Sequence, residues 1–149
     1  MTTTPWPVHA LAALWPVVLV GAGLWFHQNS PERLYGKAWE LMRASRQLDA
    51  ASAFDAAFDA RKSDAKKEEA LFWSAKAYEQ AGQRETALQR YRTLTANYHG
   101  YWLAESLYTQ AQLEKSSGNL APSQMAARRL LQEFPNDRWA QRLIQETKP

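Results

Sequence analysis

The sequence predicts an all-α protein, in which a single N-terminal transmembrane helix precedes an α-solenoid of about three helical hairpins and a C-terminal capping helix. Three observations support this fold class. The first 30 residues carry no Asp, Glu, Lys or Arg, so all 18 basic and all 15 acidic side chains follow them. The region 30–149 lacks alternating β-branched runs and is rich in Ala, Glu, Gln, Arg and Leu. This region also matches itself at offsets of 36 and 37 residues.

The charge-free part predicts a membrane anchor at residues 1–29. Its span, residues 6–26, has 21 residues, and a helix of that length measures about 31 Å, which fits one bilayer crossing. A cleaved signal peptide is the alternative, because Gly21, Ala22 and Gly23 offer small residues to a peptidase. The lack of a basic segment before the span favours an uncleaved anchor.

Four residues of the span indicate contact with a partner helix. Pro16 cannot donate a backbone hydrogen bond and should kink the helix. Its neighbour Trp15 places an indole N–H where lipid offers no acceptor. Gly21 and Gly23 allow another helix to approach closely. A passive anchor, with Trp15 packed on lipid, is the alternative.

The region 30–149 predicts a helical repeat domain with units of about 31–67, 68–103 and 104–135 and a capping helix at 136–147. In the middle unit the apolar residues of each helix are spaced by 4 and 3, which places them on one face. A lone hairpin cannot cover both of its apolar sides, so stacking with neighbouring hairpins is required. The residues that define this unit are Leu71, Ala75, Tyr78, Gly82, Ala87, Tyr91 and Leu94.

This pattern resembles the tetratricopeptide repeat, and the 36 to 37-residue period is similar to the variants found in bacterial envelope assembly factors. The resemblance covers residues 31 to about 135. The first unit departs from the pattern with Ser45 in place of the turn glycine. The third has Glu114 and Ser123 where an aromatic residue and an alanine are expected.

The expected location is a bacterial inner (cytoplasmic) membrane, crossed once. No Lys or Arg precedes the span, whereas four follow it within about 20 residues: Arg33, Lys37, Arg43 and Arg46. The positive-inside rule then places the repeats in the cytoplasm. The periplasm is the alternative, because many small anchored proteins with similar repeats face it.

No constellation for catalysis is found, so the chain is predicted not to be an enzyme and to use no cofactor or metal. Cysteine is absent, and the three histidines have no carboxylate or nucleophile at a useful spacing. A small-molecule substrate and nucleic acid are likewise not expected, since the net charge is only +3. The basic cluster near the second hairpin is interpreted as a solvated turn with acidic neighbours: Arg61, Lys62, Lys66 and Lys67, with Asp64, Glu68 and Glu69.

Protein binding is the function that the resemblance implies, because the first helix of each such unit lines a groove. An aromatic residue recurs at one groove position in all three units, and the next position is more varied. Packing of these rings in the core is the alternative. The predicted groove residues are Tyr35, Phe72 and Tyr108, then Trp39, Lys76 and Gln112. Tyr101 and Trp102, in the turn before the third unit, are expected to make a lateral contact.

Two functions remain open. The first is a non-enzymatic membrane-anchored adaptor or accessory subunit that binds and stabilises a larger bacterial membrane protein complex. The second is a transient, chaperone-like assembly or quality-control factor for envelope proteins. In both cases the expected partners are proteins.

Overall fold

The computed structural model describes residues 30–148, and within this range every regular element is an α-helix. The all-helical prediction is confirmed for this part of the chain. The seven helices described are α3 Pro31–Arg43, α4 Gln47–Ala60, α5 Asp64–Gln80, α6 Arg84–Asn97, α7 Leu103–Ser116, α8 Leu120–Glu133 and α9 Arg138–Thr147.

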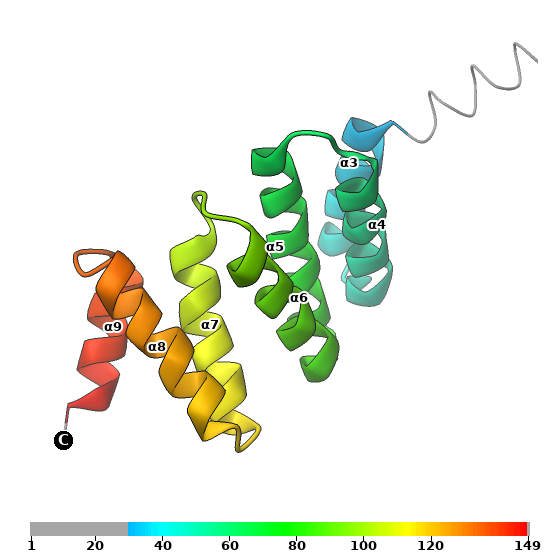
Figure 1. Cartoon of the computed structure of the whole chain (residues 1–149). Helices are drawn as coiled ribbons and strands as arrows, with labels where there is room; N and C mark the ends of the chain where they lie inside the picture. Colours follow the sequence, from blue (N-terminus) through cyan, green and yellow to red (C-terminus); the bar gives the residue numbers. More distant parts are fainter. Residues whose placement is uncertain (1–29, 149) are drawn as a thin grey trace, which may run out of the picture.

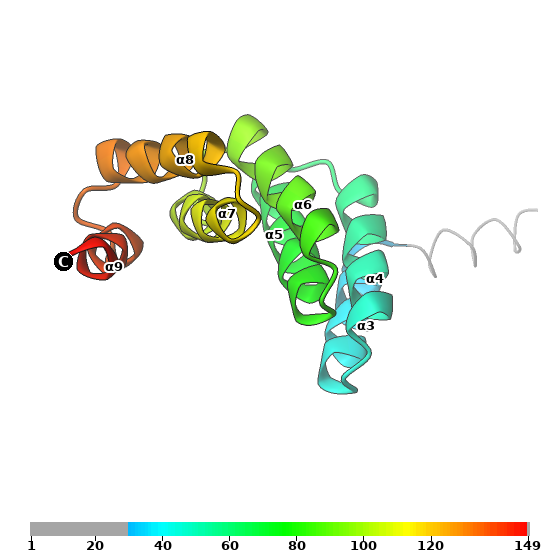
Figure 2. The same cartoon turned by 90° about the horizontal axis from the view of Figure 1, so that it is seen from below.

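Consecutive helices pair as hairpins: α3 with α4, α5 with α6, and α7 with α8 (Figure 1). In Figure 1, α4, α6 and α8 lie in front of α3, α5 and α7, and Figure 2 shows the two layers from the side. We call α3, α5 and α7 the first-helix layer. The helix α9 contacts both α7 and α8 and so covers the last hairpin. The described helices therefore form stacked hairpins, as in an α-solenoid.

The turns inside the three hairpins share one backbone conformation. Ser45, Gly82 and Gly118 have φ angles of 56°, 75° and 80°, all in the left-handed region. Only glycine adopts this region without a steric cost, so the first turn carries strain that the other two avoid. The turns follow one another at the 37- and 36-residue offsets of the sequence repeat.

Small residues bring the helices of each hairpin together. Ala75 of α5 and Ala87 of α6 are fully buried, and Ala38 and Ala50 occupy the matching positions in the first hairpin with no exposed surface. Larger side chains such as Tyr91 fill the space between the layers. Because core positions are closely packed, this arrangement fixes the distance between the two layers.

Polar contacts join neighbouring hairpins at equivalent positions. Between the first two hairpins, Asp55 of α4 accepts hydrogen bonds from Ser74 Oγ at 2.6 Å, Tyr78 Oη at 3.1 Å and Arg90 Nη2 at 2.8 Å. Between the second and third, Arg92 of α6 donates to both carboxylate oxygens of Glu114 at 2.7 and 2.9 Å. Arg92 occupies the same position in its repeat as Asp55 does in the preceding one. Both junctions between hairpins are therefore polar, the first centred on an aspartate and the second on an arginine–glutamate pair.

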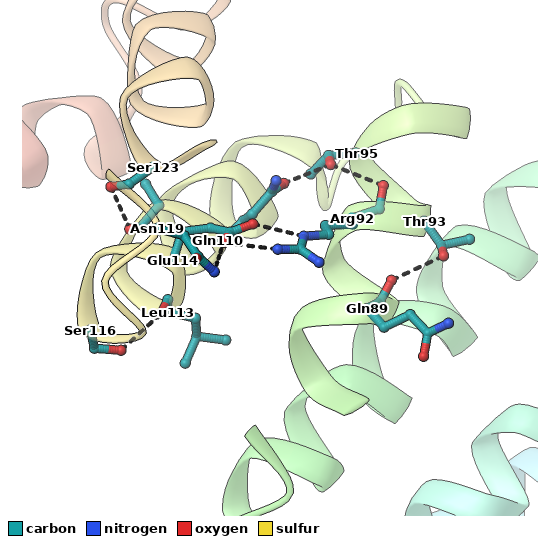
Figure 3. Close-up of polar contacts among 11 residues, drawn as sticks. Gln89, Arg92, Thr93, Thr95, Gln110, Leu113, Glu114, Ser116, Asn119 and Ser123 are labelled. Atoms are coloured by element: carbon teal, nitrogen blue, oxygen red, sulfur yellow. Dashed lines mark hydrogen bonds and ion pairs between the residues drawn. The ribbon is translucent and has the colours of Figure 1, made fainter. Parts of the chain in front are cut away.

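Glu114 and Ser123, the two residues of the third unit that depart from the repeat pattern, both have hydrogen-bond partners (Figure 3). Glu114 has no exposed side-chain surface, and besides Arg92 it accepts a hydrogen bond from Asn119 Nδ2 at 2.9 Å. Ser123 Oγ donates to the carbonyl oxygen of Ala111 at 2.8 Å. Burial alone would raise the pKa of Glu114, but the hydrogen bonds from Arg92 and Asn119 outweigh this effect and hold the pKa below its usual value.

The fold class with a transmembrane helix and the single-pass inner-membrane location need correction. None of the helices within residues 30–148 is long and apolar enough to cross a membrane. The physical reason is that a crossing takes about 20 mainly apolar residues, whereas the longest of these helices, α5, has 17 and carries several charges. The segment predicted to span, residues 6–26, lies outside the described residues. The contacts predicted for Trp15, Pro16, Gly21 and Gly23 also fall there.

We expect Ser45→Gly to raise the free energy of unfolding by about 0.5–1 kcal/mol, because it relieves the left-handed strain of the first turn. Urea denaturation of the full chain measures this change. The matched control is Ser52→Gly in the exposed part of α4, which should lower stability by about 0.5 kcal/mol. Equal effects of the two substitutions would contradict the assignment of strain to Ser45.

We expect Glu114→Gln to lower the free energy of unfolding by about 1–2 kcal/mol at pH 7, because Arg92 loses its charged partner. Since the folded-state pKa of Glu114 is lowered, this contribution is present above the unfolded value of about 4.3 and is lost as the pH falls through the folded pKa. Urea denaturation between pH 7 and pH 3 checks both points. The exposed pair Arg129–Glu133 supplies the control, since Glu133→Gln should change stability by less than about 0.5 kcal/mol. A Glu114→Gln effect that stays constant with pH would contradict the account.

Candidate functional site

Four aromatic rings form a continuous strip across the three hairpins. The ring centroids of Trp39 in α3 and Trp73 in α5 are 4.6 Å apart, and those of Trp73 and Trp102 are 5.5 Å apart. Tyr101 meets Trp102 edge-on at 4.9 Å. The three tryptophans are partly exposed, while Tyr101 is 82% exposed. We call Trp39, Trp73, Trp102 and Tyr101 the aromatic strip.

Trp39 and Trp73 lie in the first-helix layer, where the groove was expected, and Trp102 and Tyr101 lie in the turn before α7. The members of the strip differ in part from the expected set. Phe72 is only 1% exposed, because Trp102 stacks on its ring at 4.2 Å with an interplanar angle of 18°. Tyr35 is half-buried and meets both Trp39 and Phe54 edge-on. Trp102 therefore covers the core and Tyr101 projects from it.

A buried carboxylate holds the turn that carries Tyr101 and Trp102. Glu68 of α5 is 3% exposed, and its Oε1 accepts the backbone N–H of Trp102 at 2.9 Å. A Cβ atom on Gly100 would clash with Glu68 Oε2, so a larger residue there would force the carboxylate to move. Burial raises the pKa of Glu68, against the opposing effect of the backbone N–H donors of Trp102 and Gly100.

A second polar group borders the strip beside Tyr35. The Tyr35 hydroxyl donates to Glu69 Oε1 at 2.9 Å, and the Arg61 guanidinium lies 4.1 Å from the centroid of the tyrosine ring. Arg61 Nη1 is also 3.6 Å from Glu69 Oε2. Burial, reinforced by Glu69, raises the pKa of Tyr35 to about 12, so this hydroxyl stays a neutral donor at physiological pH.

Lys76 lies beyond the strip in a network of opposite charges. Its Nζ is 3.6 Å from Glu79 Oε2 and 3.9 Å from Glu105 Oε1, and Arg138 Nη2 lies 3.7 Å from Glu105 Oε2. Burial raises the pKa of Glu105, although Lys76 and Arg138 act in the opposite direction. The charges on this part of the first-helix layer are thus paired with one another.

Tyr108 lies at the other end of the layer, apart from the strip. It is 8% exposed, and its hydroxyl donates to Glu146 Oε1 of α9 at 2.7 Å. Its ring packs at a tilt on Trp139, with a centroid distance of 5.0 Å. Gln112 Nε2 donates to the same glutamate at 2.6 Å. These contacts attach the capping helix to α7.

Sequence reasoning missed one residue of this site and misplaced two others. Trp73 was not selected, although it directly follows the selected Phe72, and a one-residue shift on the helix face would have included it. Glu68 and Arg61 were expected in a solvated turn, but they are 3% and 7% exposed. Their burial depends on the loop before α7 and on the Tyr35 ring, which local patterns do not reveal. Gly100 was the one available signal for a close approach.

The chemistry that the described residues offer is binding. Within residues 30–148, no group of three or more histidine and acidic side chains is placed to hold a metal ion. Aromatic rings with partly exposed faces and paired charges at their border provide contact surface for another molecule.

The fold and the strip define an α-solenoid of helical hairpins with an aromatic first-helix layer. Residues 69–98 match the tetratricopeptide repeat family model. This match comprises most of α5 and all of α6 and confirms the resemblance in the middle unit. A tetratricopeptide repeat is a protein–protein interaction module, and the fold is in general non-catalytic. A search of curated proteins finds no match to the chain.

We expect Gly100→Ala to lower the free energy of unfolding by about 1–3 kcal/mol, because the new methyl group displaces the Glu68 carboxylate from the Trp102 N–H. Urea denaturation measures the loss. Gly36→Ala is the matched control: a Cβ atom there meets nothing within 4 Å, so stability should rise by about 0.5–1 kcal/mol. If Gly100→Ala also stabilises the chain, Glu68 does not hold this turn.

Proposed function

We propose that this chain is a non-enzymatic adaptor or accessory subunit that holds a protein partner of a larger assembly on its first-helix layer. The observation that carries the proposal is the aromatic strip, and above all Tyr101, which is 82% exposed. A large aromatic ring exposed to this extent leaves most of its surface open to contact with another molecule. Aromatic residues of this kind are enriched among the residues that dominate binding energy at protein interfaces.

The support beneath the strip favours a preformed surface. Trp102 is stacked on Phe72 and fixed through its backbone to Glu68, and Trp73 touches both Trp39 and Trp102. Rings held in this way lose little freedom when a partner binds, which lowers the entropic cost of association. The tetratricopeptide repeat at residues 69–98 supports a protein as the partner.

The test is quantitative affinity purification of the full chain from cells that express it, in wild-type form and as Tyr101→Ala. We expect a near-stoichiometric protein partner. Its recovery should fall at least about fivefold in the variant, because the exposed Tyr101 ring is lost. Leu120→Ala is the control, since Leu120 is 62% exposed on α8, away from the strip. Equal recovery by wild type and Tyr101→Ala would place the contact elsewhere on the molecule.

A further inference from the structure

We propose that a hollow between α7, α8 and α9 binds an aromatic side chain of a partner protein, with an acidic group beside the ring that pairs with Lys115. The site lies at the C-terminal end of the stack, shares no residue with the aromatic strip and does not depend on the proposed function. Three features support it: the size of the hollow, the rings that fill the equivalent space in the other two hairpins, and the charge at its edge.

The hollow lies where α8 packs against both α7 and α9, which Figure 2 shows below it. Its volume is about 260 Å³, and the residues that matter here are Ala111, Lys115, Ser123, Gln124, Ala127 and Leu143. Ala111, Ser123 and Leu143 are at most 9% exposed and form its inner wall, whereas Lys115 and Gln124 are exposed. An apolar cavity of about 150 Å³ is large enough to bind benzene, so this hollow has room for an aromatic ring.

The hollow is present because the third hairpin lacks a large core ring. By the offsets of 36 and 37 residues, Ala127 of α8 occupies the position of Tyr91 in α6 and of Phe54 in α4. Both of these rings are fully buried. Gln124 likewise occupies the position of Leu88, which has no exposed surface. Compared with the second hairpin, the third therefore lacks two large apolar groups next to the hollow.

The equivalent rings show how a ring is held at this position. Phe54 meets Tyr35 of α3 edge-on at 5.4 Å, and Tyr91 meets Phe72 of α5 edge-on at 6.4 Å. In each case the ring comes from the second helix of a hairpin and packs on the first. A ring supplied by another molecule would fill the corresponding space beside Ala127, where close packing is otherwise missing.

The charge at the edge of the hollow selects the group beside the ring. In the second hairpin, Tyr91 Oη donates to Glu79 Oε2 at 3.1 Å. The residue one repeat after Glu79 is Lys115, so a hydrogen-bond donor replaces an acceptor. Glu146, the other charged residue that lines the hollow, is already paired with Arg142 at 2.9 Å. A carboxylate next to the entering ring is therefore the complement of Lys115.

A protein is the source of the ring that the surroundings favour. The hollow is open at Lys115 and Gln124, so a side chain can enter while its backbone stays outside. The tetratricopeptide repeat matched at residues 69–98 is a protein-interaction module.

The first experiment is an NMR titration of the full chain, labelled at its alanine and leucine methyl groups, with 3-phenylpropionate, its uncharged amide, and propionate, which lacks the ring. We expect 3-phenylpropionate to shift the methyl signals of Ala127 and Leu143 and to bind at least about threefold more tightly than the amide, because of Lys115. Propionate should bind at least about tenfold more weakly, because the ring supplies the buried apolar area. Unchanged Ala127 signals, or equal binding of acid and amide, would overturn the inference.

Two variants test the hollow and the cation separately. Ala127→Phe fills the hollow from within, so it should bind 3-phenylpropionate at least about tenfold more weakly and melt at the wild-type temperature or above. Ala121→Phe, at an exposed position of the same helix outside the lining, is the matched control and should stay within about twofold of the wild-type affinity. Lys115→Gln should bind acid and amide equally. Unchanged binding by Ala127→Phe, or a lower melting temperature, would show that the hollow does not accept a ring.

A library of random peptides displayed on phage tests whether a protein supplies the ring. Selection on the wild-type chain with counter-selection on Ala127→Phe should yield peptides in which an aromatic residue adjoins Asp or Glu. These peptides should bind Tyr101→Ala as well as wild type, which separates this site from the proposed function. Hollow-dependent peptides without this pairing, or none at all although 3-phenylpropionate binds, would overturn the inference and leave the aromatic strip untouched.

Discussion

The structure depends on one constraint, which is that a single helical hairpin cannot cover both of its apolar sides. The side that faces the next hairpin in the stack must be covered by that neighbour. Here each hairpin is covered by the first helix of the next, and the last by α9. At the junction of the second and third hairpins, Trp102 covers Phe72 from the turn before α7. A covering ring of this size has one face on the core and an edge left at the surface. The aromatic strip is thus a consequence of how the hairpins are covered.

Polar contacts between neighbouring hairpins also set the register of the stack. Asp55 joins three helices, and Arg92 with Glu114 repeats the junction one unit later with the acid on the other side. Since a buried carboxylate without its donors is costly, these pairs penalise a shift of one hairpin against the next. They specify the relative position of the hairpins that hold the strip together.

The sequence was sufficient for the helices, the turns and the small core residues of the described region, because each depends on local spacing. Ser45 was read as a departure from the repeat pattern, and the structure shows that it still adopts the left-handed turn of Gly82 and Gly118. It was wrong about Arg61 and Glu68, because their burial depends on a ring and a loop that are distant along the chain. The membrane-crossing fold class was wrong for the helices described. The selection of Phe72 as a groove residue could not anticipate that Trp102 covers it.

The most direct test of the central claim is an NMR titration of the full chain with the protein partner recovered by affinity purification, observing the indole N–H signals. Single Trp→Phe substitutions assign the signals. The account predicts that the signals of Trp73 and Trp102 shift together with that of Trp39, while Trp139, which packs on Tyr108 at the other end of the layer, stays unchanged. A shift confined to Trp139, or no shift of the three strip tryptophans at saturation with the partner, would contradict the account.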